Sequence, residues 1–139
     1  MNDKEIMDMI KSHEGYREKV YFDSVGVPTG GYGHAFLEGS RIPGIVADIL
    51  FEEDYKSAMS DYEILAKRHG LELNNVRRGV IIDMLFNMGI VRVHKFRKML
   101  LALSIGDWSK AALEMLDSKW ARQVGNRSTY LAELMRKGE

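Results

Sequence analysis

Apolar residues recur at helical spacing over most of the chain. In the first segment, Asn2 and Glu5 have the spacing of a capping box, and Gly15 is a plausible helix stop. The longest segment, residues 45–69, contains no proline or glycine. At about 1.5 Å per residue it predicts a rod of roughly 37 Å. A rod of that length exceeds the needs of one small lobe, so we expect a helix that joins two lobes.

The chain after residue 70 is predicted to be helical. Two apolar stripes, over residues 76–88 and 93–103, are each followed by a glycine. Asp107 is placed to cap a third helix, and a fourth is expected from about Ser128.

Residues 16–38 have a different character. Val20 to Phe22 have strand propensity, and the run from Asp23 to Gly26 is typical of a turn. Residues 27–32 and 35–37 are expected to supply two more short strands. Together these segments predict a small antiparallel meander beside a mostly helical chain, which is an α+β organisation.

Length and composition fit one globular domain. The chain has 139 residues, of which 45% are hydrophobic and 29% charged, and the absence of cysteine excludes disulfides and thiolate zinc sites. The start is charged from residue 3 and has no run of signal-peptide length. Because no stretch approaches the roughly 18 apolar residues of a membrane helix, we expect a chain made in the cytoplasm, without membrane insertion.

Charge is unevenly distributed although the formal net charge is zero. Residues 1–70 carry 8 basic and 13 acidic residues, and residues 71–139 carry 12 basic and 7 acidic. A basic cluster lies within residues 92–98. A solvated helix face explains this cluster. The alternatives are contact with wall polymers, with nucleic acid or with a lipid surface, and of these we prefer wall contact.

The candidate chemistry lies between residues 14 and 34. Eight residues separate Glu14 from Asp23, and five separate Asp23 from Thr29. Two carboxyl groups that face each other across a cleft are the minimal set of catalytic groups for glycoside hydrolysis. Glu14 would end a helix, where the macrodipole favours the protonated acid. Without further context, a helix-end carboxylate, a turn residue and a strand residue explain the three equally well.

Other chemistries find no support. The glycine-rich run at 30–33 lacks the ending of a phosphate-binding loop, and no second histidine follows His13 at metalloprotease spacing. The four histidines are scattered, and no nucleophile elbow of a serine hydrolase is present. We therefore expect neither metal nor cofactor.

The combination of motifs resembles the phage-type lysozymes, glycoside hydrolase family 24. The resemblance rests on the Glu14–Asp23–Thr29 spacing with G-Y-G-H after it, on V-R-R-G-V-I-I-D-M-L-F-N-M-G at 76–89, and on S-K-W-A-R-Q-V-G-N-R at 118–127. It implies a two-lobed α+β fold in which a small antiparallel sheet lobe and a larger all-helical lobe are joined by a long helix. The first helix would pack on the helical lobe.

The resemblance also implies lobe bounds within a single domain of residues 1–139. The sheet lobe with the catalytic stretch would take residues 13–60. The helical lobe would take residues 1–12 together with residues 70–139.

Roles for the site residues follow from the same resemblance. Glu14 would be the general acid, and Asp23 with Thr29 would position and activate a water on the opposite face of the sugar, with inversion. Arg127 matches an arginine that pairs with the acid. Its charge would lower the pKa of Glu14, whereas burial would raise it, and the sequence leaves the balance open.

Four further positions can be compared with the family. Asn87 falls at a polar cleft position where it could contact a sugar, and Phe96 matches a supporting aromatic residue. His34 matches a structural histidine. Glu114 makes a cleft-lining position more acidic than expected.

The implied substrate is bacterial peptidoglycan, cut between N-acetylmuramic acid and N-acetylglucosamine. We expect a monomer that binds no nucleic acid and that waits in the host cytoplasm until a holin opens the membrane. A lytic transglycosylase is one alternative, although that reaction does not need Asp23. The other is a wall-binding or virion module that kept the scaffold and lost the activity.

Overall fold

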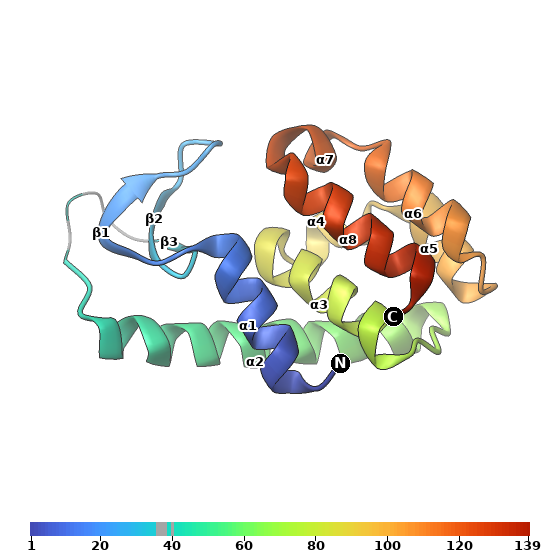
Figure 1. Cartoon of the computed structure of the whole chain (residues 1–139), viewed down its shortest axis with the longest axis horizontal. Helices are drawn as coiled ribbons and strands as arrows, with labels where there is room; N and C mark the ends of the chain where they lie inside the picture. The colour runs from blue at the N-terminus through green and yellow to red at the C-terminus, as the bar shows by residue number, and fades with distance from the viewer. Residues whose placement is uncertain (36–38, 40) are drawn as a thin grey trace.

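The computed structural model describes residues 1–35, 39 and 41–139. In this part of the chain, helices and one three-stranded antiparallel sheet make an α+β fold, as predicted (Figure 1). The strands are β1 (Arg17–Phe22), β2 (Pro28–Gly31) and β3 (His34–Ala35). The helices are α1 (Asp3–Glu14), α2 (Gly44–His69), α3 (Asn75–Met88), α4 (Ile90–His94), α5 (Arg97–Ser104), α6 (Trp108–Leu116), α7 (Lys119–Val124) and α8 (Asn126–Lys137).

The sheet is the predicted meander, with strand order β1-β2-β3. Phe22 pairs with Pro28 across the first hairpin, and Thr29 pairs with Ala35 across the second. The third strand was expected over 35–37. It reaches Ala35, and positions 36 and 37 lie outside the described residues. His34 lies 2.6 Å from the Asp54 carboxylate on α2, which ties the sheet to that helix.

Helix α2 runs beneath both parts of the molecule and joins them (Figure 1). It begins after Pro43 and ends at Gly70, whose left-handed conformation (φ 64°, ψ 40°) stops the helix. Near its start, Ala47 packs in a small apolar cluster with Val20 of β1 and with Ile42, which precedes the helix. Further along, its buried residues belong to the main core. The predicted joining helix is therefore confirmed.

The main core lies among the helices. Helix α1 contributes Ile6, Met9 and Ile10 to it, although α1 precedes the sheet in sequence. The expectation that the first helix packs on the helical part is confirmed. Its capping box is present as well, because Asn2 accepts from the backbone of Glu5 and the Glu5 carboxylate accepts from the backbone of Asn2.

The prediction of one helix over residues 93–103 is wrong. The chain forms α4 and α5 instead, because the N–H groups of Lys95 and Phe96 bond to carbonyls three residues earlier and Phe96 leaves the helical region (ψ 58°). Helix α7, which the pattern did not predict, begins with a Ser118 cap. Helix α8 begins at Asn126, two residues before the expected start.

None of the helices in the described ranges combines the length and apolar character needed to cross a membrane. The residue bounds expected for the two lobes stay a prediction.

Candidate active site

Glu14 is the last residue of α1, and its side chain is only 13% exposed. The helix ends there because Gly15 adopts a positive φ of 68°. Arg127, in the first turn of α8, places Nη1 2.9 Å from Glu14 Oε1. The ion pair predicted between these two residues is therefore present.

A second carboxylate holds Arg127 from the other side. Asp83 on α3 is fully buried, and its Oδ1 accepts a hydrogen bond of 2.9 Å from Arg127 Nε. Nη2 lies 2.7 Å from the same oxygen, in the geometry of an ion pair rather than an aligned hydrogen bond. The other oxygen of Asp83 lies 2.7 Å from Nδ1 of His13. Glu14, Arg127, Asp83 and His13 thus form one network across three helices.

Sequence reasoning missed Asp83. Its one signal is a charged residue in the middle of an apolar stripe, at a position that the helical pattern buries. A buried carboxylate without a partner is costly, so such a position predicts a cationic partner elsewhere in the chain.

Burial sets the direction of the Glu14 pKa. Burial raises this pKa above its ordinary value of 4.5, Arg127 lowers it, and the net effect is a raised pKa. The balance that the sequence left open therefore favours the protonated acid. For Arg127, burial lowers the pKa, but the Asp83 and Glu14 carboxylates together outweigh it and raise the pKa.

Gly33 forms the wall of the site against Glu14. A Cβ at position 33 would lie 2.5 Å from Glu14 Oε2 and 2.8 Å from its Cδ, and the backbone has a positive φ of 76°. Gly33 lies in the turn between β2 and β3, where its positive φ favours glycine. Its contact with the Glu14 carboxyl is a second reason that the sequence did not reveal.

Asp23 and Thr29 are connected through Val27. Asp23 lies in the turn after β1, where its Oδ1 accepts hydrogen bonds from the backbone of Val25 (2.9 Å) and Val27 (2.8 Å). Thr29, on β2, is 5% exposed and donates its hydroxyl to the Val27 carbonyl at 2.8 Å. The turn therefore fixes both side chains relative to one backbone unit.

Asn87 and Phe96 both contact the buried Trp120. Asn87 Oδ1 accepts a hydrogen bond of 2.7 Å from the Trp120 indole N–H. The ring of Phe96 meets Trp120 edge-on, with ring centroids 6.2 Å apart. Both residues therefore hold α7 against the rest of the helical part, whatever contact they make with a substrate.

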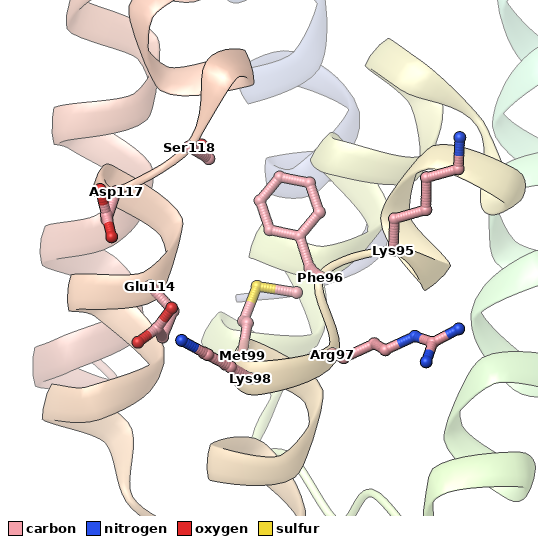
Figure 2. Close-up of a pocket in the computed structure, with 8 residues that line it drawn as sticks. All are labelled: Lys95, Phe96, Arg97, Lys98, Met99, Glu114, Asp117 and Ser118. Atoms are coloured by element: carbon pink, nitrogen blue, oxygen red, sulfur yellow. The ribbon is translucent and has the colours of Figure 1, made fainter.

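Phe96 also lines an open pocket of about 350 Å³ between α5 and α6 (Figure 2). Figure 2 shows Lys98 directed toward the Glu114 carboxylate, whereas Lys95 and Arg97 point away from it. Glu114 forms an ion pair with Lys110 at 2.9 Å. The unexpectedly acidic position thus has a cationic partner on its own helix.

Groups of three or more histidine, cysteine or carboxylate side chains arranged to hold a metal ion do not occur among the described residues.

A small sheet, a helical body and one long joining helix define the α+β lysozyme fold. Comparison with known families is more specific, because the family model described as phage lysozyme matches residues 11–138. The chain belongs to the phage lysozyme family.

Curated relatives agree with this assignment. The chain is 28% identical to "Probable T4-type lysozyme 1" of Dictyostelium discoideum, with 96% of this chain and 94% of that protein covered. It is 29% identical to the "Pre-baseplate central spike protein Gp5" of Enterobacteria phage T4, where the match covers 94% of this chain but spans only 27% of the spike protein. Membership of the family supports a glycoside hydrolase, a peptidoglycan hydrolase of the muramidase type in general.

Proposed function

We propose that this chain cleaves the β-1,4 bond between N-acetylmuramic acid and N-acetylglucosamine in peptidoglycan, with inversion. The observation that carries the proposal is the Glu14 carboxyl, which is buried against Arg127 and has a raised pKa. A carboxyl group in that state retains a proton for donation above the pH at which an ordinary glutamate loses it.

Glu14 acts as the general acid. It gives its proton to the glycosidic oxygen as the bond from that oxygen to the anomeric carbon breaks, and Glu14 becomes a carboxylate. Arg127, 2.9 Å away, stabilises the carboxylate that forms. Burial thus protects the proton before the reaction, and the arginine lowers the cost of releasing it during the reaction.

Asp23 acts as the general base on a water at the opposite face. The two hydrogen bonds that it accepts from the turn both end on Oδ1, so Oδ2 is the oxygen assigned to the proton of the water. The hydroxyl of Thr29 donates to Val27, and its oxygen lone pairs accept from the same water. Water oxygen then bonds to the anomeric carbon with inversion. Inverting enzymes place their carboxyl groups about 6.5–9.5 Å apart to admit this water.

Asn87 and Phe96 complete the proposed cleft. Asn87 Oδ1 already accepts a hydrogen bond from Trp120. The amide N–H₂ of Asn87 is therefore the group that we assign to a sugar contact. Phe96 lines the pocket between α5 and α6 and packs edge-on against Trp120.

The biological role follows as part of the proposal. A monomeric enzyme would wait in the host cytoplasm, reach the wall after a holin opens the inner membrane, and lyse the cell. One relative supports a second role, because the T4 protein bears the name of a central spike protein. A lysozyme unit of a virion, active or confined to wall binding, is therefore the alternative.

Digestion of purified Gram-negative peptidoglycan, with products identified by mass spectrometry, tests the proposed reaction. We expect muropeptides with reducing ends. Anhydro sugar ends would identify a lytic transglycosylase instead. No cleavage by folded protein that still sediments with the wall would favour the binding module.

A further inference from the structure

Asp83 has the properties of a residue that acts on the acid from a distance. It is fully buried in α3, does not touch Glu14 in any recorded contact, and holds both Arg127 and His13. Its two oxygens have different partners. Oδ1 faces Nε and Nη2 of Arg127, and Oδ2 faces Nδ1 of His13.

These contacts leave Arg127 little freedom. Nε and Nη2 are engaged by Asp83, so the guanidinium plane is set and Nη1 is directed at Glu14. The arginine side chain is 9% exposed, which restricts water from replacing either carboxylate. The position of the cation beside the acid is thus determined by a group on another helix.

His13 has a different connection to the acid. It is the residue before Glu14 on α1, its ring lies edge-on to Tyr130 of α8 at 5.4 Å, and its Nδ1 contacts Asp83. The charged groups that act on Glu14 in the described part of the chain are therefore Arg127 from α8, Asp83 from α3 and His13 from α1. Arg127 contributes a positive charge and Asp83 a negative one, and the His13 imidazole is charged only if it is protonated.

We propose that Asp83 and His13 are positioning residues of the acid. Asp83 orients Arg127, and its own negative charge favours the protonated form of Glu14, whereas His13, when protonated, adds a positive charge that favours the ionised form. This inference rests on Glu14 being the acid of the proposed reaction. It adds two residues that determine at which pH the acid is available.

The charges of Asp83 and His13 change the pKa of Glu14 in opposite directions. The negative charge of Asp83 raises the pKa of Glu14, and the positive charge of His13 lowers it. Removing Asp83 should therefore move the loss of the acid proton to lower pH. Removing His13 should move it to higher pH, although both residues belong to one hydrogen-bonded pair.

Asp83→Asn and His13→Gln separate charge from shape. The asparagine keeps an oxygen for Arg127, and the glutamine keeps an amide donor for Asp83. Asp3→Asn is the matched control, because Asp3 also binds an arginine (Arg78, 3.2 Å) and belongs to α1, away from the Glu14 network.

Two measurements test the proposal on each folded variant. The alkaline limb of the pH profile of kcat/KM should move to lower pH in D83N, to higher pH in H13Q, and remain unchanged in D3N. Titration of the Glu14 side-chain carboxyl by carbon NMR should move in the same directions. Because the NMR titration does not depend on turnover, it tests the network even if Glu14 proves not to be the acid.

The proposal is overturned if the Glu14 titration is unchanged in both variants while their thermal stability falls, since that pattern defines a purely structural pair. Shifts of the same sign in D83N and H13Q would also contradict it. If D83N does not fold, the proposal is tested by the shift of the Glu14 titration in H13Q. Shifted NMR titrations with an unshifted rate profile would retain the network and reject Glu14 as the acid.

Discussion

The pKa of Glu14 is subject to two opposed effects. Burial at the end of α1 makes its ionisation costly, and the Arg127 guanidinium makes it favourable. Neither effect alone would serve an acid catalyst. A buried carboxyl without the cation would release its proton with difficulty, and an exposed one beside the cation would already be ionised. The fold supplies burial and the cation together, because Glu14 ends α1 in a buried position and Arg127 lies beside it in the first turn of α8.

Gly33 gives a prediction at this scale. Gly33→Ala should sharply reduce activity, because the new Cβ would lie 2.5 Å from Glu14 Oε2 and displace the carboxyl. It should also cost about 1–3 kcal/mol of stability, because alanine disfavours the positive φ. Activity assays and urea unfolding measure the two effects separately.

Gly70→Ala is the control for this variant. Gly70 also has a positive φ (64°), but a Cβ there meets nothing within 4 Å. It should lose comparable stability and keep full activity. Equal loss of activity in both alanine variants would show that backbone strain, and not the contact with Glu14, explains the Gly33 result.

Thr29 gives the second prediction. Thr29→Val keeps the shape of the side chain and removes the hydroxyl, so kcat should fall by about 10²-fold if the hydroxyl orients the water. Loss of its bond to the Val27 carbonyl should cost only about 1 kcal/mol. The exposed Thr129→Val supplies the same chemical change on the surface of α8. Unchanged kinetics in T29V would reduce Thr29 to a strand residue.

At the scale of elements, the sequence predicted the helix ends that are determined by residues close to them in the chain. The Asn2 cap and the stops at Gly15 and Gly70 were readable because each acts within a few residues. The break between α4 and α5 was not, because the apolar stripe continues through Phe96 at helical spacing. Helix α7 has only six residues, too few for a pattern to emerge.

The candidate site follows the same division. Glu14 and Arg127 were found through motifs, whereas Asp83 required the fold. Asp83 lies 44 residues from Arg127 and 70 from His13 in sequence, so only the packing of α1, α3 and α8 brings them together. Spacing along the chain carries no information about such a contact.

The basic cluster on α4 and α5 gives a prediction for these elements. Arg92, Lys95, Arg97 and Lys98 are exposed, and none has a carboxylate within ion-pair distance among the described residues. Charge reversal by Lys95→Glu with Arg97→Glu should weaken sedimentation with peptidoglycan at low salt, because wall carboxylates would meet negative charge.

The effect should disappear at about 1 M salt, where the Debye length is about 3 Å. The exposed Lys4, on α1, supplies the control Lys4→Glu. Unaltered sedimentation of the double variant at low salt would identify the cluster as a solvated face.

At the scale of the whole molecule, the two parts differ in what holds them together. The main core gathers buried residues from most of the helices, whereas the cluster beneath the sheet consists of Val20, Ile42 and Ala47. Tyr32 packs on both clusters and connects them. The sheet is therefore the part of the molecule with the smaller local stability.

Hydrogen exchange measures this difference. Backbone amides of β1 and β2 should exchange much faster than those of α3 and α5, because opening the sheet exposes only the small cluster. Since Asp23 and Thr29 belong to this part, such opening would also disrupt the proposed water site. Equal protection in both parts would mean that the molecule opens only as one unit.

The most direct test of the account compares the parent protein with Glu14→Gln on purified peptidoglycan. The amide is nearly isosteric with the acid but has no proton to donate, so we expect reducing-end muropeptides from the parent and none from the variant. Circular dichroism and thermal unfolding must show that the variant is folded. If the folded variant released the same products at the parental rate, Glu14 would not be the acid and the central claim would be wrong.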